Sequence, residues 1–181
     1  MMDQLLSNPV AAAIIQFLNE IGLAVKAETF DEKTFLPGIK MDQGVILIDP
    51  ARLKYPGDLL HDAGHLAIKA DKERRQAGPD AGGDPAEEMM AIAWSYAALT
   101  HLELPLEVVF HPDGYRGESP SLIENFGQGR YFGVPMLQWL GMTADEKQAK
   151  ELGIAPYPHM TNWLRPEGLP PEGEDGDLRA D

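Results

Sequence analysis

Residues 58–68, DLLHDAGHLAI, decide how this chain is expected to fold. Their apolar side chains recur at helical spacing, so the stretch predicts a helix. His61 and His65 stand four residues apart, which places them on the same face of that helix with β-carbons about 5–6 Å apart. Two ring nitrogens presented together can bind one zinc ion at about 2.0–2.1 Å. The stretch therefore predicts a metal-binding helix.

The segments before this helix predict another helix and then a small sheet. Ser7 or Asn8, followed by Pro9, is a start signal for a helix whose apolar residues repeat at helical spacing until Gly22. The runs LAVKAETF, FLPGIKM and GVILIDP have the β-branched or alternating character of strands, and MDQG between the last two is typical of a hairpin turn. We therefore expect a small, mostly antiparallel sheet.

A second long helix is expected after the histidine stretch. Asp84 and Pro85 predict its N-cap and first helical residue, and its pattern runs to about Leu104, ahead of a proline. Residues 70–83, between the two helices, are charged and then glycine-rich, so they predict a loop over the surface. The two helices are thus expected to be neighbours joined by a polar connection.

The chain beyond residue 105 predicts shorter helices, in the runs SPSLIENFG, YFGVPMLQWLG and TADEKQAKELG. In the last of these, Thr143 and Glu146 have the spacing of a capping box, and Gly153 predicts the end of the helix. Together with the sheet, these segments predict an α+β fold with a helical C-terminal part.

A metal ion on two histidines needs a third ligand, and the helix from Asp84 offers Glu87 and Glu88. Glu87 stands three residues beyond the cap, where a glutamate bonds back to the cap residue. Glu88 shares an apolar helical face with Ile92 and is expected to turn inward, where a carboxylate needs a partner such as a metal ion. Glu88 is therefore the predicted third ligand, and Glu87 stays open as the alternative.

The order of these parts resembles a known family. The succession LPGIKMDQGVILIDP, DLLHDAGHLAI and EEMMAIAWSYAAL is similar to that of the ImmA/IrrE-type zinc metallopeptidases, in which a hairpin precedes an HExxH helix and a later helix begins with a zinc-binding glutamate. The resemblance covers roughly residues 10–105. It implies a zincin-like domain with zinc as the cofactor and His61, His65 and Glu88 as its ligands. It also implies that Gly64 lets the metal helix approach a neighbouring strand.

One position departs from that family pattern. The residue after the first histidine is Asp62, where the family has glutamate as the general base that takes a proton from metal-bound water. A base must lie within about 2.6–3.2 Å of that water, directly or through a second water. Aspartate is one methylene shorter, and a misplacement near 1 Å can cost about a hundredfold in rate. Asp62 is the predicted catalytic residue, and both a metallopeptidase and a metal-binding protein without hydrolysis stay open.

The letters LLHDAGH also resemble the HD-domain phosphohydrolases, which are all-helical enzymes whose adjacent His and Asp bind metal. Their site requires a further upstream histidine, whereas His61 is the first histidine of this chain. The strand-like runs before it also argue against an all-helical fold. This class and a non-enzymatic interaction module are kept as alternatives.

Further polar side chains could donate to a developing oxyanion, but nothing in the sequence places them near the histidine helix. Each is predicted to be structural: His101, His111, Tyr115, Arg130, Tyr131 and His159.

The composition limits the remaining possibilities. A chain of 181 residues with 44% hydrophobic residues predicts one domain, which we place at residues 1–165. Because cysteine is absent, a transition-metal site must be built from histidine and carboxylates. A net charge of -14 opposes direct contact with nucleic acid. Residues 166–181 hold six acids and one arginine among Pro and Gly, and predict an acidic disordered tail.

The sequence also indicates where the protein works. No apolar stretch approaches the roughly 20 residues that cross a bilayer. The N-terminal run MMDQLLSNPV lacks the basic region of a secretory signal. We expect a cytoplasmic protein that acts on a peptide or protein and has no membrane partner. The sequence does not indicate an oligomeric state.

Overall fold

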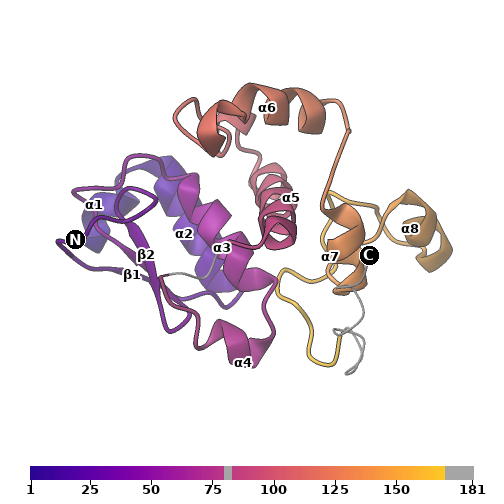
Figure 1. The fold of residues 1–181 in the computed structure, drawn as a ribbon, viewed down its shortest axis with the longest axis horizontal. Helices are drawn as coiled ribbons and strands as arrows, with labels where there is room; N and C mark the ends of the chain where they lie inside the picture. The colour runs from indigo at the N-terminus through magenta and orange to yellow at the C-terminus, as the bar shows by residue number, and fades with distance from the viewer. Residues whose placement is uncertain (80–82, 170–181) are drawn as a thin grey trace.

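The computed structural model describes residues 1–79 and 83–169, which form helices and one three-stranded sheet (Figure 1). The helices are α1 (Met2–Leu6), α2 (Pro9–Glu20), α3 (Asp58–Ala67), α4 (Asp71–Arg74), α5 (Pro85–His101), α6 (Ser119–Gly127), α7 (Val134–Trp139) and α8 (Glu146–Leu152), with the 3-10 turns η1 (Leu106–Val108) and η2 (Tyr115–Gly117). The strands are β1 (Val25–Ala27), β2 (Ile39–Asp42) and β3 (Val45–Ile48). The expected α+β class is confirmed.

Helix α5 lies at the centre of the molecule (Figure 1). The sheet, α2 and α3 lie on one side of it, α6 crosses one end, and α7 and α8 lie on the other side (Figure 1). Trp94 and Leu99 of α5 are fully buried in the same core as Ile46 of the sheet and Leu60 of α3. One continuous core therefore joins the sheet to the central helices.

Helix α2 begins as its sequence predicts. The Asn8 side chain accepts hydrogen bonds from the backbone amides of Val10 (2.9 Å) and Ala11 (3.2 Å), and Pro9 is the first helical residue. This N-cap satisfies two of the backbone amides that a helix start leaves without partners. Of the two start residues that the sequence left open, Ser7 and Asn8, the structure has Asn8 as the N-cap.

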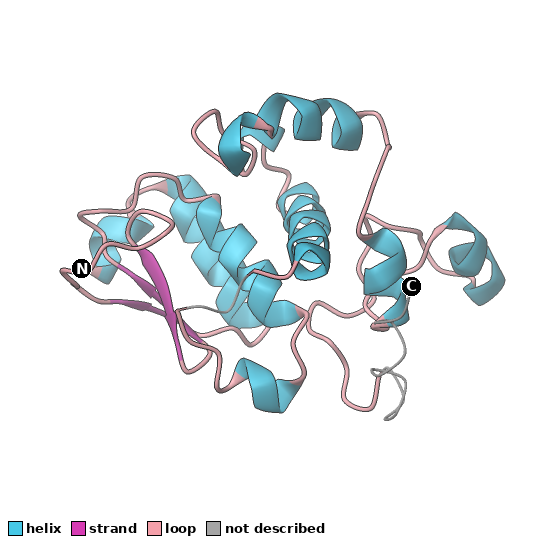
Figure 2. Cartoon of the chain, viewed as in Figure 1, coloured by secondary structure: helices cyan, strands magenta, loops and turns pink. Residues whose placement is uncertain are grey.

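The sheet is mixed, so the prediction of a mostly antiparallel sheet is wrong. Its strand order is β1-β3-β2, with β1 parallel and β2 antiparallel to β3. Figure 2 draws these strands in magenta. The reason is the connection of residues 28–38, which crosses from one edge of the sheet to the other and leaves the central place for β3. The hairpin itself is confirmed, because Gln43 (φ 46°) and Gly44 (φ 75°) both adopt the left-handed conformation that a tight two-residue turn requires.

Helices α3 and α5 approach closely at Gly64. A β-carbon on Gly64 would lie 2.9 Å from the carbonyl oxygen and 3.0 Å from the Cα of Ala91 on α5. The predicted neighbour was a strand, and this is wrong: the close contact is with a helix. Ser95 of α5 donates to its own helix at the Ala91 oxygen (2.6 Å) and also lies 3.2 Å from the Leu60 oxygen of α3. The crossing is thus fixed by a small residue and a hydroxyl bridge.

Helix α5 starts as predicted and ends earlier. Asp84 is its N-cap and accepts from the Ala86 amide (2.8 Å), which confirms the predicted start. The predicted end near Leu104 is wrong, because the helix stops at His101 and Glu103 (φ 54°) turns the chain away.

The segment after α3 is more structured than a surface loop. Residues 71–74 form the short helix α4, and Arg74 is buried. Its guanidinium donates to the carbonyl oxygens of Leu66 (3.0 Å) and Lys69 (2.9 Å), at the C-terminal end of α3. The backbone amide of Gly44, in the hairpin turn, donates to the Ala77 oxygen (3.0 Å). The loop prediction is therefore wrong for residues 71–74, whereas residues 75–79 form turns and irregular chain.

The C-terminal part returns to the central helix. The Tyr157 hydroxyl donates to the Ala93 oxygen (2.8 Å), and the Trp94 indole donates to the Trp163 oxygen (2.9 Å). These two contacts bring the segment after α8 onto α5.

Helix α8 corrects one prediction and confirms another. The predicted capping box at Thr143 is wrong, because Asp145 caps the helix by accepting from the Gln148 amide (2.8 Å). The Thr143 hydroxyl instead donates to the His159 oxygen (2.7 Å). The predicted end at Gly153 (φ 67°) is confirmed.

Of the predicted acidic tail, residues 170–181 lie outside the described part of the chain. Within residues 1–79 and 83–169, no helix has both the length and the apolar character needed to cross a membrane. The domain boundary at residue 165 and the cytoplasmic location stay predictions.

Candidate metal centre

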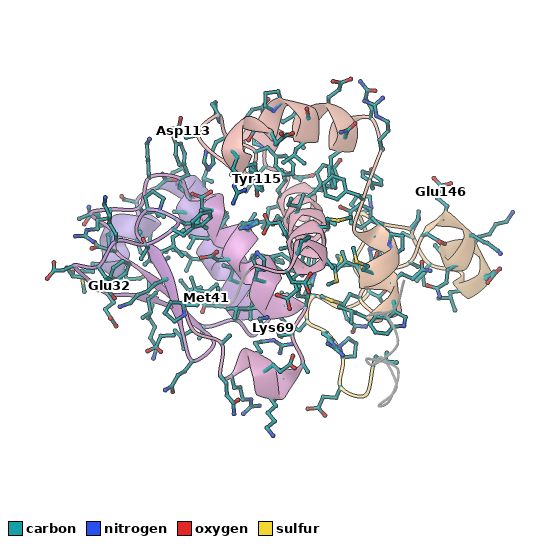
Figure 3. All side chains as sticks on the ribbon, viewed as in Figure 1. Glu32, Met41, Lys69, Asp113, Tyr115 and Glu146 are labelled. Carbon is teal, nitrogen blue, oxygen red and sulfur yellow. The ribbon has the colours of Figure 1, made fainter. Side chains whose placement is uncertain are left out.

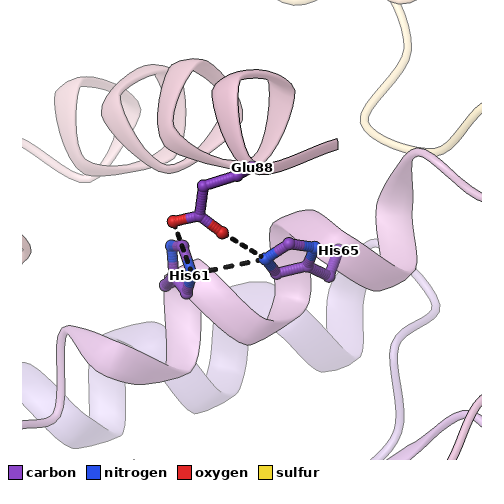
Figure 4. Close-up of side chains that lie close together, drawn as sticks. All are labelled: His61, His65 and Glu88. Carbon is purple, nitrogen blue, oxygen red and sulfur yellow. Dashed lines mark hydrogen bonds and ion pairs between the residues drawn. The ribbon is translucent and has the colours of Figure 1, made fainter. Parts of the chain in front are cut away.

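The structure brings the three predicted ligands together (Figure 4). The Nε2 atoms of His61 and His65 lie 3.3 Å apart. One carboxylate oxygen of Glu88 lies 3.4 Å from the first of these nitrogens, and the other oxygen lies 3.1 Å from the second. His61, His65 and Glu88 thus form a group that could hold a metal ion.

The spacing of these atoms fits a tetrahedral ion. Ligands placed tetrahedrally at about 2.0–2.1 Å from zinc are about 3.3–3.4 Å apart. The two Nε2 atoms have this separation, at 3.3 Å, and each of them lies 3.1–3.4 Å from a different carboxylate oxygen of Glu88. One ligand atom of each of the three residues lies within 4.8 Å of the other two.

The crossing of α3 and α5 creates this arrangement. The two histidines come from one face of α3, on either side of the close approach at Gly64. Glu88 lies in the first turn of α5, three residues before Ala91, the residue that Gly64 contacts. A larger residue than glycine at position 64 would separate the carboxylate from the rings.

The centre is closed on the histidine side and open on the glutamate side. The side chains of His61 and His65 are 10% and 5% exposed, whereas that of Glu88 is 43% exposed. A ligand could therefore approach from solvent along the carboxylate.

The charges of the group support one another. Burial opposes the charged form of His61, but the hydrogen bond and negative charge of Glu88 outweigh it and raise the pKa of His61. Burial likewise opposes ionisation of Glu88, but hydrogen bonds from His61 and His65 outweigh it and lower the pKa of that carboxyl. The carboxylate is thus held in the ionised form that a metal ion requires.

Asp62 follows His61 on α3 and is partly exposed. Burial raises the pKa of Asp62 to about 6, against the opposing charges of His61 and His65. Its side chain makes no hydrogen bond or ion pair within the described residues, so it is free to take a partner.

Tyr115 lies against the centre, although the sequence predicts only a structural role. Its hydroxyl lies 3.3 Å from Nδ1 of His61, and the two rings meet edge to face with centroids 5.4 Å apart. Burial raises the pKa of Tyr115 well above its ordinary value, so the phenol keeps its proton. No local pattern could have revealed this contact, because Tyr115 lies in a turn 54 residues away.

A second acid–histidine pair lies one turn earlier on α3. Nε2 of His111 lies 2.7 Å from a carboxylate oxygen of Asp58, and both side chains are buried. The ring of Tyr55 stacks on that of His111 with centroids 3.7 Å apart. Ser119 donates to the His111 carbonyl oxygen (2.7 Å). This pair holds the segment of residues 111–119 against α3.

The remaining candidates lie elsewhere. Glu87, the alternative ligand, has both carboxylate oxygens 3.3 Å from Nζ of Lys69 instead of facing its helix cap. Arg130 pairs with Glu124 (3.1 Å), and Tyr131 packs on Phe126. The other two, His101 and His159, line a separate cleft with Trp163.

Comparison of the chain with models of known families, with curated proteins and with solved structures finds no match. The resemblance to the ImmA/IrrE-type metallopeptidases therefore rests on the sequence motifs alone.

Proposed function

We propose that the protein is a zincin-like, zinc-dependent metallopeptidase that acts on a peptide or a regulatory protein. His61, His65 and Glu88 would hold the zinc ion. The observation that supports this most directly is the convergence of the two Nε2 atoms, 3.3 Å apart, with a carboxylate whose two oxygens lie 3.4 Å and 3.1 Å from them. Three protein ligands leave the fourth tetrahedral position open, as in catalytic zinc sites. The exposed side of Glu88 supports access of a substrate to that position.

In the proposed hydrolysis, the zinc ion and Asp62 have different roles. Zinc supplies a Lewis acid that polarises a carbonyl group and lowers the pKa of a bound water toward about 7. Asp62 would accept the proton of the attacking water and return it to the leaving amine nitrogen. Its carboxylate is one methylene shorter than the glutamate expected there, so a second water is the natural relay.

Metal binding is the first test. We expect His61→Ala and Glu88→Ala each to weaken zinc binding by more than about 100-fold. Loss of a ligand should cost more than loss of a hydrogen-bond partner of a ligand, which weakens binding by about 10–100-fold. Competition with a chromophoric chelator measures this. Glu87→Ala is the matched control, because the neighbouring glutamate faces Lys69, and it should stay within about threefold of the wild type. Equal zinc affinity in all four proteins would remove the metal centre.

Hydrolysis is the second test, with Asp62→Glu compared with Asp62→Ala on a mixture of peptides. If reach limits the rate, the glutamate variant should gain up to about a hundredfold, while the alanine variant should lose activity. Zinc binding without hydrolysis in every version would favour a metal-binding protein instead. The shorter side chain of Asp62 is the observation behind that alternative.

The phosphohydrolase alternative has a separate signature. Release of phosphate from nucleotides, lost in Asp62→Asn, would support it. The three-stranded sheet before α3 and the recruitment of Glu88 from α5 favour the metallopeptidase.

A further inference from the structure

The two histidines of the candidate metal centre differ in the partner of Nδ1, the ring nitrogen that does not contact Glu88. Nδ1 of His61 faces the Tyr115 hydroxyl at 3.3 Å, whereas Nδ1 of His65 is buried and has no hydrogen-bond partner within the described residues. Tyr115, labelled in Figure 3, comes from the segment before α6 and reaches toward α3. Within the described residues, only His61 of the two therefore has a side-chain partner at Nδ1 that can fix the rotation of its ring.

A tyrosine hydroxyl can form a hydrogen bond with Nδ1 of a histidine both when a metal ion is bound to that histidine and when it is absent. When Nε2 of a histidine binds a metal ion, the ring proton sits on Nδ1 and needs an acceptor. Without the ion, Nε2 of His61 can donate to Glu88, and Nδ1 then needs a donor. A hydroxyl can play either part, so Tyr115 can keep the ring in place before and after the metal binds.

The segment that carries Tyr115 is held in an unusual conformation. Tyr115 (φ 53°) and Arg116 (φ 52°) are consecutive non-glycine residues in the left-handed region, which such residues rarely adopt. Two contacts fix the segment just before them: His111 with Asp58, and Asp113 with Lys54 at 2.8 Å. The fold thus holds the Tyr115 ring edge-on to His61 at a local conformational cost.

We propose that Tyr115 is a positioning residue of the metal centre, whose hydroxyl fixes the His61 ring so that Nε2 faces the ion. This inference deepens the proposed function and rests on its zinc site, but not on peptide hydrolysis. Tyr115 acts through His61 and is not itself a ligand, because its hydroxyl faces the ring nitrogen opposite the metal side.

The test is the zinc affinity of Tyr115→Phe, which keeps the ring and removes the hydroxyl. Loss of a hydrogen bond behind a metal ligand typically weakens binding by about 10–100-fold, and we expect a loss in that range. Tyr131→Phe is the matched control, because that phenol lies in the aromatic cluster with Phe126, and it should bind zinc like the wild type. Thermal unfolding of both metal-free variants checks that each is folded, and Tyr115→Phe should lose no more stability than one hydrogen bond contributes.

A second measurement follows the proton on Nδ1 of His61 by NMR of the zinc-loaded protein. In the wild type this proton should exchange slowly with water, and in Tyr115→Phe it should exchange fast. Wild-type zinc affinity in Tyr115→Phe, or an equal loss in Tyr131→Phe, would overturn the positioning role while leaving the zinc site intact. Failure of the wild type itself to bind zinc would overturn both proposals. Absence of hydrolysis alone would overturn only the enzymatic one.

Discussion

Two acid–histidine groups lie one turn apart along α3, and they differ in the number of side chains and in their exposure to solvent. Asp58 meets His111 as a single pair, with both side chains buried and Tyr55 stacked on the ring. His61 meets Glu88 as part of a three-membered group with one side open to solvent. Burial of a histidine against an acid is common to both groups. What distinguishes the candidate metal centre is the convergence of two ring nitrogens on a carboxylate that is itself partly exposed to solvent.

The two carboxyls also respond in opposite ways to their surroundings. Burial raises the pKa of Asp58, and its hydrogen bond with His111 only partly offsets this. Glu88 has two histidine partners, which outweigh burial and lower its pKa. The buried pair of Asp58 and His111 thus disfavours ionisation of its carboxyl. The group around Glu88 favours ionisation of its carboxyl.

The largest effect is expected when the buried pair loses its histidine. His111→Ala leaves Asp58 buried without a partner, which should lower the free energy of unfolding by about 3 kcal/mol. Urea unfolding of the metal-free protein measures this. Zinc affinity should fall no further than in Tyr115→Phe, because the pair holds only the segment behind His61. A zinc loss as large as in His61→Ala would place the pair inside the metal centre and end the contrast.

A smaller effect is expected from separating α3 and α5. Gly64→Ala adds a β-carbon 2.9 Å from the Ala91 oxygen, and overpacking of this kind costs about 1–3 kcal/mol. Zinc binding should weaken because Glu88 comes from the other helix, whereas the pair of Asp58 and His111 does not involve α5. Thermal unfolding and zinc titration measure the two effects. Gly78→Ala is the control, since its β-carbon would meet open space, and equal behaviour of the two variants would contradict the crossing as the cause.

The smallest effect is an inverted order of titration in the metal-free protein. Free aspartic acid is more acidic than free glutamic acid, yet Asp58 should take up its proton at a higher pH than Glu88, because its pKa is raised and that of Glu88 is lowered. Carbon-13 NMR of the carboxyl groups measures both, and Glu88→Gln assigns the signals. The usual order, with Asp58 protonated last, would show that the two sites are alike.

The same shifts set opposite effects on stability. The lowered pKa of Glu88 adds stability above the ordinary glutamate pKa, and this is lost as the pH falls through the folded value. The raised pKa of Asp58 favours the folded state at low pH, and that contribution is lost as the pH rises through its folded value.

Local sequence signals were enough to predict the parts that meet at the centre. The spacing of His61 and His65 fixes their common face, and the cap at Asp84 sets the register that turns Glu88 toward them. Both follow from the geometry of one helix turn, which depends on neighbours in the sequence. That these three residues bind zinc stays a prediction.

Local sequence signals could not predict the contacts between segments that lie far apart in the sequence. The parallel place of β1 depends on how residues 28–38 cross the sheet, and alternation within a strand says nothing about its neighbour. Tyr115 and His111 reach α3 across 54 and 53 residues through an irregular segment. Glu87 and Glu88 could be ranked only by helix face, and the contact of Glu87 with Lys69 shows where the other carboxylate goes.

The contact between the hairpin turn and the segment of residues 74–77 limits where this chain can be lengthened. A tight turn at the protein surface is ordinarily a place where extra residues are accepted. Here the turn at Gly44 bonds to Ala77, and Arg74 in the same segment satisfies the last carbonyls of the histidine helix. A residue inserted at the turn would therefore loosen the end of α3, and natural variants of this fold should vary in length elsewhere.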